Sequence, residues 1–180
     1  VQKSVDSRLQ AINRLMSTYD PESELSQFNK YRGQGWFAVS ADTAKVVQFA
    51  LDVAKKTKGA LDPTIGPVVN LWGFGPEGRR LEPPGEAAIA EAKKRVGYQQ
   101  VVVRISPPAL RKAQPDVYLD LSAVAKGFAV DDISELLKRY GCDNSLVVIG
   151  GDIPPNGPKP DGRHWKVGIQ DHGTVPHPMN

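Results

Sequence analysis

The residues best suited to chemistry lie between Val117 and Asp152. A short apolar run ends at Asp120, a turn passes through Ser122, and the following residues predict a helix whose first turn carries Lys126. Backbone N–H groups at a helix start have no partner inside the helix and lie at the positive end of its dipole, so they favour a phosphate group. A lysine there opposes the dipole, and such local conflicts concentrate at functional sites. A nucleotide-type ligand is therefore the leading hypothesis for this segment.

The same stretch also has a purely structural interpretation. Asp120 can cap the turn while Lys126 is solvated, and the residues alone do not separate this reading from the first. The run Gly150–Asp152 follows an apolar strand and is by default a turn, although two adjacent glycines also make room for a ligand.

A second candidate is the loop from Gly59 to Pro67, in which Gly59 and Gly66 can take positive φ. A stiff loop of small residues lets a planar ligand approach the backbone closely. Asp62 and Thr64 offer oxygen atoms to Mg²⁺ or to hydroxyl donors. The alternative is an Asx turn that leads into the next element, which is the more common role of Asp-Pro-Thr.

Three polar or aromatic residues near the N-terminus form a third candidate. Tyr19, at the end of a predicted helix, can stack on an aromatic ligand, with half-buried packing as the alternative. Ser26 and Asn29 are expected to bond locally as turn residues.

The composition is that of one soluble globular domain: 180 residues, 40% hydrophobic and 24% charged. The formal net charge is only +3 and no basic block occurs, so nucleic-acid binding is not supported. Cys142 is the single cysteine, which excludes an intrachain disulfide. The histidines 164, 172 and 177 lack the spacing of zinc ligands, and no apolar run is long enough to span a bilayer.

Hydrophobic periodicity predicts the elements that must position these residues. The predicted helices cover residues 1 to 18, 41 to 58 (with Ser40 as N-cap and Gly59 as the stop) and 85 to 96. A polar loop is expected up to Trp36, and the Pro- and Gly-rich residues 61 to 72 are expected to be largely irregular. Strands are predicted at residues 98–105, 117–121, 145–149 and 165–169. Helices and strands without strict alternation predict an α+β fold with a mixed sheet and packed helices.

Taken together, six segments in order along the chain resemble the ApbE family of FAD:protein FMN transferases, once described as thiamine-biosynthesis lipoproteins. The segments are MSTY at 16–19, SELSQFN at 23–29, GALDPTIGPVVNLWGFGP at 59–76, YLDLSAVAKGFAVD at 118–131, LVVIGGD at 146–152 and HWKVGI at 164–169.

The resemblance implies an ApbE-like α+β fold and a Mg²⁺-dependent enzyme. Such an enzyme cleaves FAD, attaches FMN through a phosphoester to a threonine of an acceptor protein, and releases AMP. By position, the resemblance implies that Tyr19 contacts the flavin nucleotide and that Ala60, Leu61 and Asp62 line its pocket. It implies that Asp120 accepts a hydrogen bond from FAD and that Lys126 lies at the same ligand. It also implies that the main-chain carbonyl of Ala123 binds Mg²⁺.

The sequence departs from the family pattern at both ends. The family's first strand is absent before Val1, and the motifs His-x-x-Asp-Pro-x-Thr-Gly and Ala-Asp-x-x-x-Thr do not occur. In the family these motifs supply the catalytic histidine and the side-chain metal ligands. Residues 1–180 are therefore expected to be the N-terminal and central portion of one ApbE-like domain, inactive alone and with no catalytic residue assigned.

Two other functions stay open: an FAD-binding protein without transferase activity, and an FAD pyrophosphatase that releases FMN and AMP. The resemblance also implies a periplasmic protein, held to the inner membrane by a lipid anchor outside this chain.

Overall fold

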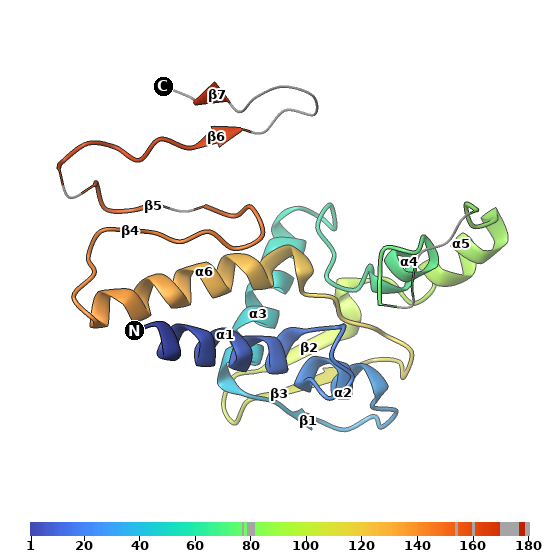
Figure 1. Cartoon of the computed structure of the whole chain (residues 1–180). Coiled ribbons are helices and arrows are strands. Elements are labelled where there is room, and N and C mark those ends of the chain that lie inside the picture. The colour runs from blue at the N-terminus through green and yellow to red at the C-terminus, as the bar shows by residue number, and fades with distance from the viewer. Residues whose placement is uncertain (77, 79–81, 154, 160, 170–176, 179–180) are drawn as a thin grey trace. The chain divides into compact units, whose positions relative to one another are not determined.

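The computed structural model describes residues 1–76, 78, 82–153, 155–159, 161–169 and 177–178. The chain divides into two compact units, a larger one (Ser7–Ala125) and a smaller one (Val1–Asp6 with Lys126–Asn180). Both boundaries fall inside helices, α1 (Gln2–Met16) and α6 (Ser122–Arg139), as Figure 1 shows. Helices and antiparallel strands together confirm the predicted α+β class.

The larger unit is built on a three-stranded antiparallel sheet in the order β1-β3-β2, made of β1 (Phe37–Ala38), β2 (Val101–Arg104) and β3 (Ala109–Lys112). Helix α3 (Ala41–Lys56) packs against β2 and against the short 3-10 helix η1 (Tyr98–Gln100) (Figure 1). Leu110 faces Phe37 and Val103 on the two neighbouring strands and is fully buried, so it marks the core side of the sheet. Every strand pairing among the described residues is antiparallel, and the mixed sheet predicted from the sequence is therefore wrong for this part.

Helix α3 confirms the prediction and shows what fixes its ends. The Ser40 side chain accepts a hydrogen bond from the Thr43 N–H at 3.1 Å, as an N-cap does. At the other end Lys58 and Gly59 both have positive φ, and the Gly59 N–H donates to the Ala54 carbonyl at 2.8 Å. This is the left-handed ending typical of helices, so Gly59 acts as the expected stop with positive φ.

Two helices lie where irregular chain was predicted. Helix α2 (Glu24–Lys30) occupies the expected polar loop, because Ser23 caps it and Leu25 and Phe28 bury their side chains completely. Helix α4 (Gly66–Leu71) forms within the Pro- and Gly-rich stretch. Its proline lies in the first turn, where a backbone N–H would have no partner inside the helix, so the N–H that proline lacks is not missed.

The predicted strand at residues 117–121 is also wrong. Residues 117–121 pair with no strand of the described structure, and side chains satisfy part of their backbone instead. The predicted strand at 98–105 begins as η1 and becomes β2 only at Val101. Helix α1 and helix α5 (Glu86–Lys93), which packs on α4, agree with prediction.

The smaller unit contains most of α6 and two short strand pairs. The pairs are β4 (Ser145–Leu146) with β5 (Pro155–Asn156), and β6 (Gly168–Ile169) with β7 (His177–Pro178). The strands predicted at 145–149 and 165–169 are thus shorter than expected, while His172 lies outside the described residues.

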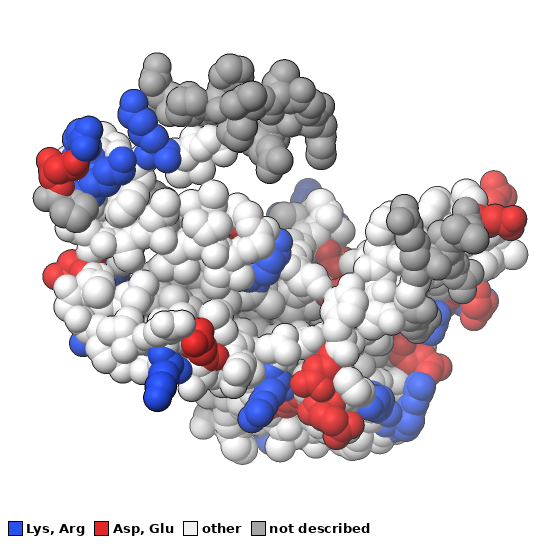
Figure 2. All heavy atoms as spheres, viewed as in Figure 1, with Lys and Arg blue, Asp and Glu red and all other residues white. Residues whose placement is uncertain are grey.

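The surface agrees with the weak net charge. Figure 2 shows both acidic and basic side chains spread over the face in view, among uncharged residues. Of the helices in the described ranges, none combines the length and the apolar character needed to cross a bilayer.

Lys112 is the most unusual core residue of the larger unit, because its side chain is only 4% exposed. Its ammonium group donates to the carbonyls of Phe28, Asn29 and Val117 at 3.2, 3.0 and 3.2 Å. Burial, assisted by the Arg32 guanidinium and opposed by Asp116, lowers the pKa of Lys112 from 10.5 to about 8. The group is therefore mainly charged at neutral pH.

This shift predicts a pH dependence of stability. Between pH about 8 and 10.5 the unfolded chain holds a proton that the folded chain has released. The free energy of unfolding should thus rise with pH across this window, by at most about 1.4 kcal/mol per pH unit. Denaturant unfolding at several pH values should show this slope in the parent chain and in Lys45→Met, an exposed-lysine control, but not in Lys112→Met. Equal slopes in all three chains would contradict the prediction.

Candidate functional site

A cleft with a volume of about 350 Å³ lies within the larger unit. Most of its wall comes from four places: Thr18 and Tyr19 after α1, the loop from Leu61 to Ile65, Phe74 and Gly75 after α4, and the start of α6. Ala50 of α3 and Val69 of α4 complete it. The structure therefore brings segments that are far apart in the sequence around one hollow.

Five of the seven residues predicted for the site line this cleft, namely Tyr19, Leu61, Asp62, Asp120 and Ala123. Ala60 precedes Leu61 but is not part of the wall, and Lys126 belongs to the smaller unit. The ligand contacts expected of all seven remain predictions.

Tyr19 is 67% exposed, and its hydroxyl donates to the Phe74 carbonyl at 3.3 Å. Its backbone is held by the Ser17 hydroxyl, which accepts from the Tyr19 N–H at 3.1 Å. The Ser17 carbonyl in turn accepts from the hydroxyls of Ser23 and Ser26. The serines of this motif thus fix the turn that presents an exposed aromatic ring to the cleft.

Asp62 holds its loop together through both carboxylate oxygens. Oδ1 accepts from the N–H and the hydroxyl of Thr64 at 2.8 and 2.6 Å, and Oδ2 accepts from the Tyr98 N–H at 3.0 Å. Thr64 is fully buried and accepts from the Gly97 N–H at 2.7 Å. The Asx-turn interpretation of Asp-Pro-Thr is therefore confirmed, and the carboxylate shapes the cleft wall through these bonds.

Gly66 is needed for space and not for a left-handed backbone. Its φ is not positive, so the left-handed conformation that a glycine permits is not used here. A Cβ at this position would lie 2.3 Å from Cδ1 of Tyr118 and 3.5 Å from Cβ of Asp120. The glycine lets the ring of Tyr118 pack directly on the start of α4, next to the Asp120 side of the cleft.

Asp120 connects the cleft loop to the start of α6. Its N–H donates to the Pro63 carbonyl at 2.8 Å, and its Oδ1 accepts from the Ser122 N–H at 2.8 Å. Within the described part of the chain, neither Oδ2 of Asp120 nor the N–H of Ala123 has a hydrogen-bond partner. A carboxylate acceptor and a free helix N-terminal donor therefore lie on one wall of the cleft.

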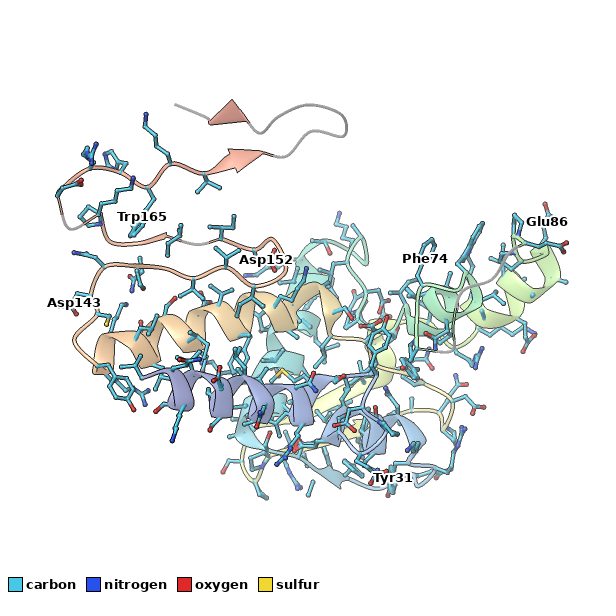
Figure 3. The ribbon with its side chains drawn as sticks, in the orientation of Figure 1. Tyr31, Phe74, Glu86, Asp143, Asp152 and Trp165 are labelled. Atoms are coloured by element: carbon cyan, nitrogen blue, oxygen red, sulfur yellow. The ribbon has the colours of Figure 1, made fainter. Side chains whose placement is uncertain are left out.

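Lys126 is the fifth residue of α6, so its predicted place in the first turn is wrong. Its ammonium lies 3.5 Å from the Gly150 carbonyl and 3.8 Å from the carboxylate of Asp152, which Figure 3 labels. Gly150 and Gly151 both have positive φ, and Ile149 and Asp152 exchange backbone hydrogen bonds across them. The glycine pair thus forms a two-residue hairpin turn. The Asp152 carboxylate that follows it offers Lys126 a partner within the smaller unit.

The residues present fit only part of a magnesium site. Among the residues that the structure describes, no three His, Cys, Asp or Glu side chains gather as metal ligands would. Asp120 offers one carboxylate oxygen and Ala123 offers main-chain atoms, whereas Mg²⁺ at a nucleotide usually takes one or two carboxylates together with phosphate oxygens. The assignment of Ala123 as a metal ligand stays a prediction.

The sequence reasoning did not single out Phe74, which is 76% exposed on the cleft wall and is labelled beside α4 in Figure 3. Its signal was the Trp-Gly-Phe-Gly run, which the family motif at 59–76 includes without assigning Phe74 a role. Asn29 was expected to bond locally, yet its amide bonds to Leu119, far along the chain.

Comparison with known proteins agrees with this arrangement. The family model described as ApbE family matches residues 1–179. A curated FAD:protein FMN transferase of Haemophilus influenzae is 42% identical over 176 residues, which is 96% of this chain and 51% of that protein. The chain spans about half the length of the curated relatives it matches.

Solved structures give the same result for the fold. The flavin transferase ApbE from Vibrio cholerae has a TM-score of 0.91 at 37% identity, covering 99% of this chain and 58% of that one. The apo flavinyl transferase ApbE of Pseudomonas stutzeri has a TM-score of 0.85 at 31% identity, covering 93% and 55%. With a family match along nearly its whole length and the same fold, the chain belongs to the ApbE family.

Proposed function

We propose that this chain carries the FAD-binding part of an FAD:protein FMN transferase. The cleft supports this proposal, because one wall combines the free Oδ2 of Asp120 with the N-terminus of α6. The carboxylate oxygen can accept a hydrogen bond from a hydroxyl or amino group of a nucleotide, and the N–H groups of a helix N-terminus can donate to its phosphates. The exposed rings of Tyr19 and Phe74 suit a flat aromatic ring system.

In the proposed reaction the hydroxyl oxygen of an acceptor threonine bonds to the phosphorus of the FMN half of FAD. The bond from that phosphorus to the bridging oxygen breaks, and this oxygen leaves with AMP. The hydroxyl proton goes to a base, which the family resemblance assigns to a histidine outside this chain.

The residues of this chain bind and orient the nucleotide for that step. Asp120 accepts a hydrogen bond that fixes the ligand against the start of α6, and the Ala123 N–H donates to a phosphate oxygen. Holding the reacting groups in line is a large part of catalysis in phosphoryl transfer. When bound, Mg²⁺ would neutralise phosphate charge, with Ala123 and the phosphates among its ligands.

Two further parts of the proposal rest on the family resemblance alone. The acceptor is a flavoprotein with a target threonine, and the full-length protein is periplasmic and held to the inner membrane by a lipid anchor outside this chain. The proposed partners do not include nucleic acid.

A titration of the 180-residue chain with FAD tests the proposal. Flavin fluorescence should change saturably, and the apparent affinity should rise when Mg²⁺ is added, since the cation lowers the charge of the pyrophosphate. Riboflavin, which lacks phosphate and adenosine, is the matched ligand control and should bind much more weakly. Equal affinity for FAD and riboflavin, or no saturation with FAD, would contradict a nucleotide site in this chain.

The products of the full-length protein separate transfer from the two alternatives. Transfer gives AMP and an acceptor whose mass has increased by one FMN group. Release of both FMN and AMP into solution would indicate a pyrophosphatase, and unchanged FAD would indicate a binding protein.

A further inference from the structure

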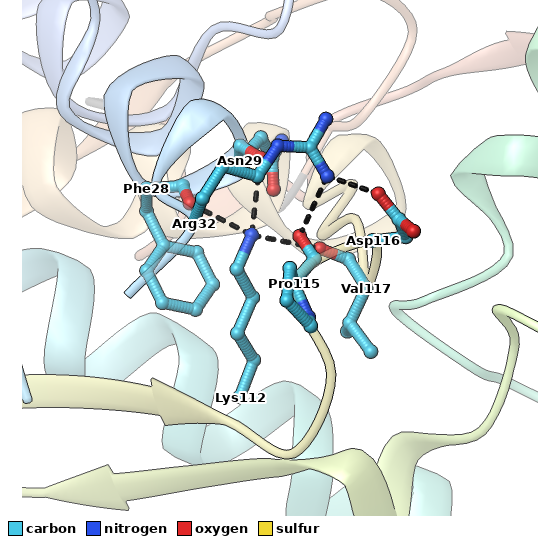
Figure 4. A network of polar contacts seen from close by, with 7 residues as sticks. All are labelled: Phe28, Asn29, Arg32, Lys112, Pro115, Asp116 and Val117. Carbon is cyan, nitrogen blue, oxygen red and sulfur yellow. Dashed lines mark hydrogen bonds and ion pairs between the residues drawn. The ribbon is translucent and has the colours of Figure 1, made fainter. Parts of the chain in front are cut away.

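We propose that Asn29 and Lys112 are positioning residues that hold residues 117–121 and thereby fix where Asp120 presents its carboxylate to the cleft. Figure 4 shows the Lys112 part of this network. The importance of Asp120 for FAD rests on the proposed function, whereas the positioning itself does not. Neither Asn29 nor Lys112 lines the cleft, so any effect on the ligand must pass through the segment that they hold.

The segment needs such support because it is buried without being part of a sheet. Val117, Leu119 and Leu121 are at most 1% exposed, and their side chains enter the core. Buried backbone N–H and C=O groups must find partners, and here no neighbouring strand provides them. The Val117 and Asp120 N–H groups bond to the main-chain carbonyls of Gln114 and Pro63. The Leu119 N–H and the carbonyls of Val117 and Leu119 are instead satisfied by side chains.

Asn29 supplies two of these partners from α2. Its Nδ2 donates to the Leu119 carbonyl and its Oδ1 accepts from the Leu119 N–H, both at 2.8 Å. The side-chain amide thus forms the pair of bonds that a residue of an adjacent strand would form. An ionised aspartate would keep only the acceptor, and an aliphatic side chain would provide neither bond.

Lys112 supplies the next partner from β3. Its three ammonium protons match three carbonyls, those of Phe28 and Asn29 in the last turn of α2 and that of Val117. A cation at the C-terminal end of a helix is favourable for the dipole. One buried charge therefore joins β3, α2 and the beginning of the segment. This gives a reason for burying a lysine, which is rarely buried in proteins.

The outer side of the network is closed by charged residues. Arg32 donates to the Pro115 carbonyl and pairs with the Asp116 carboxylate, as Figure 4 shows. At the far end, the Asp120 N–H bonds to the Pro63 carbonyl of the cleft loop. The main chain from residue 115 to residue 120 is thus held at Pro115, Val117, Leu119 and Asp120, with the last anchor in the cleft wall.

A double-mutant cycle on FAD affinity tests whether Asn29 acts through Asp120. Asn29→Ala should weaken FAD binding roughly tenfold in the parent chain, because the backbone beside Asp120 loses two hydrogen bonds. In the Asp120→Ala background the same change should alter the affinity less than about twofold. Gln27→Ala, on the same helix but bonded to Pro21, is the control and should change nothing. Equal weakening in both backgrounds would overturn the proposal.

Amide hydrogen exchange tests the positioning without any ligand. In Asn29→Ala the Leu119 and Asp120 amides should exchange at least about tenfold faster, while the amides of α3 stay protected. Asn29→Asp, which keeps the acceptor, should protect the Leu119 amide better than alanine does. Lys112→Met should give the same pattern at residues 117–120. Unchanged exchange at Leu119 in folded Asn29→Ala would refute the positioning. Failure of the parent chain to bind FAD would instead refute the proposed function.

Discussion

Replacing Asp120 by alanine is expected to weaken FAD binding roughly tenfold to one hundredfold, equivalent to about 1–3 kcal/mol. The Oδ2 of this carboxylate lies on the α6 wall of the cleft and accepts from no protein donor within the described residues. A ligand N–H or O–H buried against that wall would lose its partner in the variant. Flavin fluorescence titration of the parent and variant chains measures the difference.

Two matched variants separate ligand binding from helix stability. Asp120→Asn keeps an oxygen for the Ser122 N–H but replaces the second acceptor by a donor, so it should preserve the melting temperature and still weaken FAD binding. Ser122→Ala removes only the hydroxyl bonded to Oδ1 and should leave the affinity within about threefold. FAD affinity that is unchanged in both Asp120 variants would remove this residue from the site.

Part of the fold follows from local sequence signals. The N-cap of α3 at Ser40 and its end at Gly59 depend on a few neighbouring residues, so a pattern of residue types is sufficient to predict them. The hydrophobic periodicity of α1 is equally local. The cleft residues in the quoted motifs could also be predicted, because the family resemblance indicates which sequence positions form the site even where their geometry is unknown.

The rest depends on contacts between distant residues. Residues 117–121 have the composition of a strand, but several of their backbone partners are side chains. Asn29 lies far away in the sequence, and Lys112 lies on β3. No local pattern reveals such partners. In the same way, the short helix α2 is stabilised mainly by complete burial of Leu25 and Phe28 rather than by its polar composition.

Gly66 leaves room for the ring of Tyr118, and the sequence alone did not reveal this requirement. Gly66→Ala should lower the free energy of unfolding by about 2–3 kcal/mol, because the new methyl group would overlap the ring of Tyr118 at 2.3 Å in a buried position. Gly127→Ala is the control. Its Cβ would meet no atom within 4 Å in the helix interior of α6, so it should stabilise by about 0.5–1 kcal/mol.

The partner ring can be tested directly with a second substitution. Tyr118→Leu removes much of the overlapping ring, so Gly66→Ala should cost at least about 1 kcal/mol less in that background than in the parent chain. Because the new methyl also lies 3.5 Å from Cβ of Asp120, the single variant should bind FAD more weakly than Gly127→Ala does. Denaturant unfolding and FAD titration measure both effects. If Gly66→Ala were as stable as the parent chain, the tight packing of Tyr118 on the start of α4 would not be what requires a glycine there.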